Sequence, residues 1–143
     1  MIIMDTNVLV AALRSRTGWS RQMLFQVLRA ELVAGVSVPL FIEYEAVLQR
    51  AEQRAVFGLS SKEVDAFLAG LASVLRPIDI SFLWRPQLKD PADEMVLEAA
   101  VNGQCSHLIT WNLRDFALAA PRFHLQLATP AQYYATQPPA KPH

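Results

Sequence analysis

Six acidic side chains stand at positions from which a folded chain could gather them around a cation. They are Asp5, Glu43, Glu45, Asp90, Asp93 and Asp115. A pocket of four or more carboxylates is stable only when cations or protons neutralise it, because like charges at short range repel one another. Oxygen ligands without cysteine or histidine suit hard cations such as Mg²⁺ and Mn²⁺. If these side chains lie together, the sequence indicates a site for one of these ions.

Each of these carboxylates also has a structural alternative. The aspartates all stand where a helix is expected to begin, and aspartate there caps backbone N–H groups or interacts with the helix dipole. The segment Asp90-Pro91-Ala92-Asp93 is a favourable helix start, with Asp90 at the N-cap and Pro91 at the first helical position. Glu43 and Glu45 could be solvated residues beside a buried helix stripe. Only their meeting in space favours a metal site, so the expected fold matters.

Short apolar segments alternate with stretches of helical periodicity along the chain. Strands are expected at residues 1–4, 33–38, 74–80, 107–110 and 125–128, with helices between them and a last helical turn at 130–134. This alternation predicts one α/β domain with a mostly parallel sheet of about five strands. In an open parallel sheet, ligands bind outside the carboxyl ends of the strands. Asp5 and Thr110 stand at two such ends.

Local signals predict where several helices begin and end. Ser20 is expected to cap the second helix, and Ser60 with Glu63 has the pattern of a capping box. Asn102 and Gly103 are expected to close the helix before them with a left-handed residue. These positions fix the order of the elements but not the distances between them.

Composition limits the class of protein. The chain has 143 residues and a mass of 16.0 kDa, and its mean hydropathy is +0.20, which fits one folded domain. Residues 1–135 are expected to form that domain, and the Pro-rich residues 136–143 are expected to be disordered. The apolar stretch 32–42 is too short to cross a bilayer. The chain has one cysteine, Cys105, and no signal-peptide pattern at its start. We therefore expect a cytoplasmic protein that does not associate with a membrane.

Four segments, taken in order, resemble a known family. They read MDTNVLVAALR, EYEAVLQR, DPADEMVLEAA and LITWNLRDF. This series is similar to the PIN-domain ribonucleases, and most similar to the toxin components of bacterial toxin–antitoxin systems (VapC-like). The resemblance covers roughly residues 1–130. It implies a three-layer α/β/α PIN-like fold and metal-dependent cleavage of single-stranded RNA by an activated water.

The resemblance also implies which carboxylates do the chemistry. It places the catalytic groups at Asp5, Glu43, Asp93 and Asp115, and the ligands of one or two Mg²⁺ or Mn²⁺ ions at these four residues and Asp90. Helical geometry leaves Glu43 and Glu45 equivalent on either side of Tyr44, and the family pattern favours the acid before the tyrosine. Asn112 stands where many relatives carry an aspartate, so the fourth charge is assigned to Asp115.

Neighbouring polar and aromatic residues are expected to assist the carboxylates in the proposed reaction. Asn7 and Thr110 would orient Asp5 and the water, while Trp111, Asn112 and Arg114 would support the site or contact the RNA. The chain has 13 basic and 13 acidic residues, and setting aside the five candidate ligands leaves 8 acidic against 13 basic, a surplus of 5 positive charges. Such a surplus suits a nucleic-acid partner, and Arg14, Arg16 and Arg21 cluster after the first helix.

Other functions remain to be distinguished. A haloacid-dehalogenase-type phosphatase would need a second aspartate where Asn7 stands, and a receiver domain would need a lysine on a late strand, which this chain lacks. The main rival is a PIN-fold module that binds RNA or protein with weak or no nuclease activity. The expected partners are single-stranded RNA, an antitoxin protein and a second copy of the chain in a homodimer.

Overall fold

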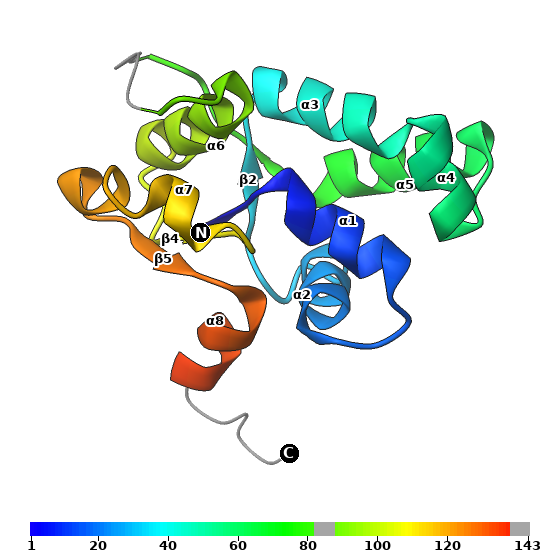
Figure 1. Cartoon of the computed structure of the whole chain (residues 1–143), viewed down its shortest axis with the longest axis horizontal. Coiled ribbons are helices and arrows are strands. Elements are labelled where there is room, and N and C mark those ends of the chain that lie inside the picture. The colour runs from blue at the N-terminus through cyan, green and yellow to red at the C-terminus, as the bar shows by residue number, and fades with distance from the viewer. Residues whose placement is uncertain (82–87, 138–143) are drawn as a thin grey trace.

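The computed structural model describes residues 1–81 and 88–137, which form alternating strands and helices (Figure 1). The strands are β1 (Ile2–Met4), β2 (Gly35–Val36), β3 (Arg76–Pro77), β4 (His107–Ile109) and β5 (Gln126–Ala128). The α-helices are α1 (Thr6–Arg14), α2 (Trp19–Leu28), α3 (Val38–Leu48), α4 (Ala51–Phe57), α5 (Ser61–Val74), α6 (Pro91–Asn102), α7 (Leu113–Phe116) and α8 (Pro130–Thr136). A 3₁₀ turn, η1 (Ala120–Phe123), precedes β5.

All strand pairings are parallel. The central sheet has the order β1-β4-β5, and Met4 pairs with Ile109, which in turn pairs with Ala128. Strands β2 and β3 form a separate pair. The predicted α/β class with a mostly parallel sheet is therefore confirmed, and the carboxyl ends of β1 and β4 lie side by side.

The central sheet is smaller than predicted. Five strands form where the sequence places them, but in the described part of the chain only three belong to the central sheet. A single bridge between Ile2 and Ala34 links them to the β2–β3 pair. Strands β2 and β3 have two residues each, and Pro77 in β3 has no N–H to donate to a further ladder bond.

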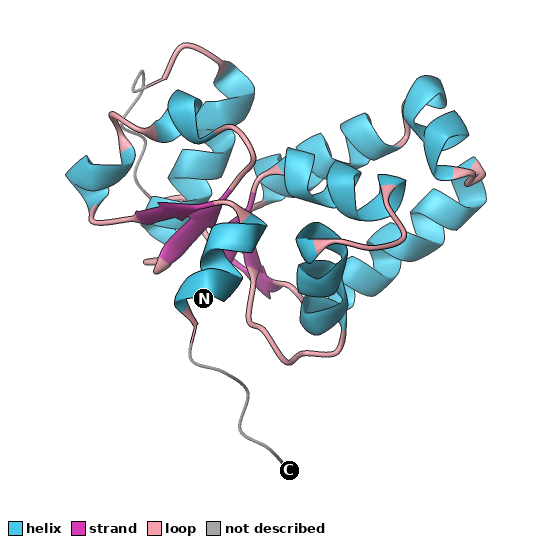
Figure 2. Ribbon diagram, turned by 60° about the horizontal axis from the view of Figure 1, so that its bottom comes forward, coloured by secondary structure: helices cyan, strands magenta, loops and turns pink. Residues whose placement is uncertain are grey.

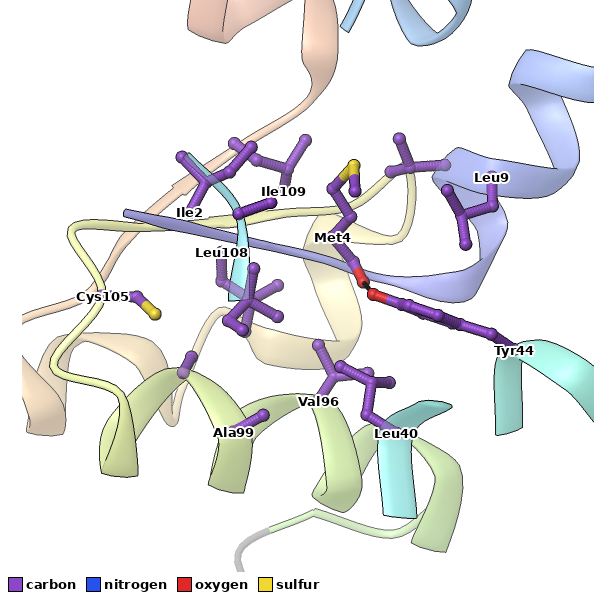
Figure 3. Close-up of a cluster of buried hydrophobic side chains, with 14 of the residues drawn as sticks. Ile2, Met4, Leu9, Leu40, Tyr44, Val96, Ala99, Cys105, Leu108 and Ile109 are labelled. Atoms are coloured by element: carbon purple, nitrogen blue, oxygen red, sulfur yellow. Dashed lines mark hydrogen bonds between the residues drawn. The ribbon is translucent and has the colours of Figure 1, made fainter. Parts of the chain in front are cut away.

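Helices cover both sides of the strands, which confirms the three-layer arrangement (Figure 2). Helix α6 packs against β1 and β4, whereas α8 packs against β5 and α2. Strand β1 and the last two residues of β4 are apolar without alternation because both of their faces are buried, and Ile3, Met4, Leu108 and Ile109 are fully enclosed. Figure 3 shows this core, with Val96 of α6 directed toward the strands.

Some of the predicted helix ends are confirmed and others are wrong. Ser60 and Glu63 form both hydrogen bonds of a capping box, as predicted. The prediction for Ser20 was wrong, because Gly18 is the N-cap of α2 and the Ser20 side chain is buried. The prediction for Gly103 was also wrong: its backbone is right-handed, and Gln104 takes the left-handed conformation with φ of 51°.

The C-terminal boundary of the domain stays a prediction. Helix α8 ends at Thr136, one residue beyond the expected boundary at 135. Most of the expected disordered tail, residues 138–143, lies outside the described residues, as do residues 82–87 of the loop expected before α6. Among the described residues, no helix is both long enough and apolar enough to cross a membrane.

Candidate functional site

The candidate site begins where β1 and β4 end. The backbone N–H of Asp5 donates to the carbonyl of Ile109 at 2.8 Å, which ties the end of β1 to the end of β4. Asp5 is also the N-cap of α1, so the expected capping role is present. The two parallel strands thus bring Asp5 and Thr110, 105 residues apart in sequence, into contact.

Three hydrogen bonds hold the Asp5 carboxylate. Its Oδ1 accepts from the backbone N–H of Thr6 at 2.7 Å, and its Oδ2 accepts from Thr110 Oγ1 at 2.8 Å and from Asn7 Nδ2 at 3.2 Å. The side chain is only 7% exposed. A carboxylate held on both oxygens keeps one orientation, which is what a ligand or catalytic group needs.

The loop after β4 is fastened to the same network. The backbone N–H of Asn112 donates to Thr110 Oγ1 at 3.0 Å, and the backbone N–H of Trp111 donates to Asn7 Oδ1 at 3.2 Å. Asn7 therefore links the start of α1 to the loop, while Thr110 links that loop to Asp5. Asn112 contributes its backbone to these contacts, and the side chain of Trp111 is 43% exposed beside them.

The other three candidate aspartates line a pocket of about 440 Å³ between α6 and α7. Asp90, Asp93 and Asp115 lie in its wall together with Lys89 and Arg114. Asp90 also caps α6, because its carboxylate accepts from the N–H of Ala92 at 2.9 Å. Asp115 is not the cap predicted for its helix, since α7 begins at Leu113. Its carboxylate is instead exposed at the pocket.

Burial and the negative charges of neighbouring carboxylates raise the pKa of Asp5 and of Asp93. Burial raises the pKa of Asp5, the hydrogen bonds from Thr110 and Thr6 lower it, and the charges of Asp115 and Asp90 raise it. Burial, followed by the charges of Asp5, Asp90 and Asp115, raises the pKa of Asp93 to about 6. Four aspartates from three separate segments therefore act on one another, and a cation among them would relieve their repulsion.

Glu43 stands apart from this group. It is half-buried on α3, while Glu45 is exposed, and neither lines the pocket or is among the charges that shift Asp5 and Asp93. Its neighbour Tyr44 is fully buried and donates its hydroxyl to the carbonyl of Met4 (Figure 3). Burial and the nearby Asp5 raise the pKa of Tyr44. Helix α3 thus reaches the end of β1 through the tyrosine, and the role of Glu43 stays a prediction.

The donor set fits a hard cation in its chemistry. All the donors are oxygens, Asp5 Oδ1 accepts one hydrogen bond only, and the adjacent buried hydroxyl of Thr6 has no partner in the described part of the chain. Within residues 1–81 and 88–137, no three acidic, histidine or cysteine side chains are close enough to hold an ion as they stand.

Other residues around the pocket were not predicted from the sequence. Lys89 and Leu118 line it, and Leu118 is 84% exposed. Glu94 and Glu98 are buried on α6, and Glu94 accepts from the backbone N–H of Leu88 at the pocket wall. The four-residue spacing from Asp90 to Glu94 and Glu98 was the available signal, because it places three carboxylates along one side of a helix.

Comparisons with known proteins agree with this architecture. A solved structure of VapBC2 from Rickettsia felis, bound to a DNA fragment from its promoter, superposes with a TM-score of 0.56 at 19% identity. The alignment covers 89% of this chain and 97% of that one, and it shows a shared fold. The search of curated proteins finds no match. The family model described as PIN domain matches residues 1–114, and this chain therefore belongs to the PIN domain family.

Proposed function

We propose that this protein is a metal-dependent endoribonuclease that cuts single-stranded RNA, and that it is the toxin of a toxin–antitoxin pair. The observation that carries the proposal is the group of four interacting aspartates after β1, at the start of α6 and on α7, with Asp5 held by three hydrogen bonds. Membership of the PIN domain family supports it, because the sequence resembles the ribonucleases of that family.

The proposed ligands of one or two Mg²⁺ or Mn²⁺ ions are carboxylates of the site. They are Asp5, Glu43, Asp90, Asp93 and Asp115. When bound, such ions supply Lewis acidity that lowers the pKa of water and neutralises charge on the phosphate. Thr110, Asn7 and the N–H of Thr6 keep Asp5 from reorienting during the reaction.

The basic and aromatic residues at the pocket suit an RNA strand. Lys89 and Arg114 line the same pocket as the aspartates, and a guanidinium can bind two phosphate oxygens at once. Trp111 is exposed beside Asp5, where its ring can stack against an unpaired base. Hydrolysis of the phosphodiester by water is expected to leave a 5′-phosphate and a 3′-hydroxyl.

The experiment that tests the activity is cleavage of a 5′-labelled single-stranded RNA by the purified protein in Mg²⁺, Mn²⁺ or EDTA. Cutting is expected with either ion and not with EDTA, and Asp5→Asn is expected to lower it at least about 100-fold. Asp79→Asn is the matched control, because Asp79 is an exposed aspartate outside the acidic pocket and its change removes the same charge. RNA that is bound but not cut by folded protein would contradict the nuclease and favour a binding module.

The toxin role concerns partners and place in the cell. The similar VapBC2 structure was determined with promoter DNA. By analogy, we propose a cytoplasmic protein that forms a homodimer and binds an antitoxin protein. Growth arrest on expression, relieved by the product of a neighbouring small reading frame and absent for Asp5→Asn, is the expected result. Arrest that persists with Asp5→Asn would contradict a toxic nuclease.

A further inference from the structure

Helix α2 presents a charged aromatic stripe that was not predicted from the sequence. Arg21, Phe25 and Arg29 follow one another at intervals of four residues, which places them on one face of the helix. The guanidinium carbons of Arg21 and Arg29 lie 5.0 and 5.6 Å from the centroid of the Phe25 ring. The ring is 40% exposed, so an apolar face and two cations are presented to solvent together.

The stripe borders a pocket of about 360 Å³. Arg16, Arg21 and Arg29 line this pocket, and Glu31 is the one acidic side chain in its wall. None of the three arginines forms an ion pair within the described residues; Arg21 donates instead to the carbonyls of Ala12 and Ser15. The pocket therefore carries a net positive charge that the protein itself does not neutralise.

The start of α2 adds to this positive field. Its N-cap residue, Gly18, lies in the pocket wall and makes no side-chain capping bond. The first N–H groups of a helix and its dipole attract anions, and α2 has 10 residues. Guanidinium groups and a helix start thus face the same pocket, which favours a phosphate-bearing ligand.

Trp111 connects this surface to the candidate active site. Its indole Nε1–H donates to Ser20 Oγ on α2 at 2.9 Å, and its backbone N–H donates to Asn7 beside Asp5. Asn7 lies on α1 and Ser20 lies on α2, and these two helices pack against each other (Figure 1). One exposed tryptophan therefore stands between the acidic pocket and the arginines.

We propose that α2 and Trp111 form an extended binding face for the single-stranded RNA whose cleavage is proposed above. The face is defined by Arg16, Arg21, Phe25, Arg29 and Trp111. Single-stranded nucleic acids bind where a positive groove meets aromatic rings, because phosphates need charge and unpaired bases need stacking surfaces. An acidic peptide would use the charge but would leave the exposed rings without a partner.

Binding is measured separately from cleavage. The probe is a fluorescein-labelled RNA of 20 nucleotides with randomised sequence, titrated by anisotropy in EDTA against the Asp5→Asn protein. Combining Arg16→Glu with Arg29→Glu is expected to weaken binding at least about 10-fold and to reduce the salt slope by about 1–2. Arg21 is left intact because it holds two backbone carbonyls.

Two further variants separate charge and stacking from general effects. Lys62→Glu with Arg76→Glu makes the same change in charge at exposed positions on α5 and β3, and binding is expected to change less than about 2-fold. Phe25→Leu keeps the charge and removes the ring, and a loss of about 5-fold is expected. Circular dichroism verifies that each variant is folded.

The outcomes distinguish this face from the proposed nuclease. Equal binding by the arginine and control variants overturns the face, as does failure of the folded parent protein to bind the RNA. Preference of this surface for a polyglutamate peptide over the RNA also overturns it. RNA bound through the face but never cut by wild-type protein with Mg²⁺ or Mn²⁺ supports the face and contradicts the nuclease. Cleavage with an unchanged KM by the protein that carries Arg16→Glu and Arg29→Glu supports the nuclease and contradicts the face.

Discussion

At the scale of single residues, Thr110 organises the site although it carries no charge. Its hydroxyl is fully buried, donates to Asp5 Oδ2 and accepts from the side chain of Asn7 and the backbone of Asn112. One side chain thus joins the end of β4, the start of α1 and the loop that leads to Asp115. Because a hydroxyl both donates and accepts, no apolar residue of similar size can replace it.

Thr110→Val is expected to lower the free energy of unfolding by about 1–3 kcal/mol, because it leaves buried polar groups without partners. Thr110→Ser keeps the hydroxyl and is expected to retain most of that stability. Urea unfolding of the two variants measures the difference. A larger loss for Thr110→Ser than for Thr110→Val would show that the methyl group, rather than the hydrogen bonds, is what the site requires.

The raised pKa of Asp93 predicts how the stability of the folded state depends on pH in the absence of divalent ions. Its pKa rises from 3.8 to about 6 on folding, so its contribution favours the folded state below about pH 4 and is lost as the pH rises through about 6. Asp93→Asn is therefore expected to raise the melting temperature at pH 8 by about 2–4 °C, for a gain of about 1 kcal/mol, and to change it little at pH 4.

Thermal unfolding in EDTA at both pH values tests this expectation. Asp79→Asn is the control, since it removes an exposed aspartate outside the acidic pocket. A gain for Asp93→Asn that is the same at pH 4 and pH 8 would contradict the electrostatic explanation.

At the scale of the elements, the close packing around Gly103 explains why a glycine stands there, whereas its backbone conformation does not. Gly103 ends α6 with an ordinary right-handed backbone, while the following Gln104 takes the left-handed one. A Cβ at position 103 would lie 2.6 Å from Ile78 Cδ1 and 3.0 Å from the carbonyl oxygen of Ala99. The residue after β3 therefore packs against the end of α6, and an added methyl group at position 103 would require the Ile78 side chain to shift.

Gly103→Ala is expected to destabilise the protein by about 1–3 kcal/mol through this overlap. Gly70→Ala is the matched change, since Gly70 lies inside α5 and nothing stands within 4 Å of its added Cβ. That variant is expected to gain about 0.5–1 kcal/mol from helix propensity. Chemical unfolding of both compares them directly, and a stabilised Gly103→Ala would refute the packing argument.

At the scale of the whole molecule, three segments far apart in sequence must fold before the four aspartates meet. Asp5 follows β1, Asp90 and Asp93 begin α6, and Asp115 lies on α7. Their mutual repulsion opposes folding, so an ion that binds only the folded site is expected to stabilise the entire domain.

Mn²⁺ or Mg²⁺ is therefore expected to raise the melting temperature. At a free ion concentration 100 times the Kd, the gain is about 2.7 kcal/mol, or about 5–10 °C. Asp5→Asn is expected to lose most of this rise, whereas Asp79→Asn keeps it. Scanning calorimetry with each chloride salt and with EDTA makes the comparison without relying on activity. No shift at 10 mM for either ion would contradict a functional metal site.

The class of fold and the local parts of the site follow from the order of the amino acids alone. The strand positions, the capping box at Ser60 and the helix start at Asp90 followed from periodicity and from neighbouring residues. The order of the four acidic segments was enough to indicate the family. These features depend on groups a few residues apart, so the chain order contains them.

Tertiary packing, in contrast, sets which side chains meet. It joined Asp90 and Asp115 to Asp5 while leaving Glu43 outside their pocket. It also turned Ser20 inward to accept from the Trp111 indole, 91 residues away in sequence. Such contacts depend on how helices lean against the sheet and on which side chains fill the core. Distances across the fold arise from that packing, and no local pattern in the chain specifies them.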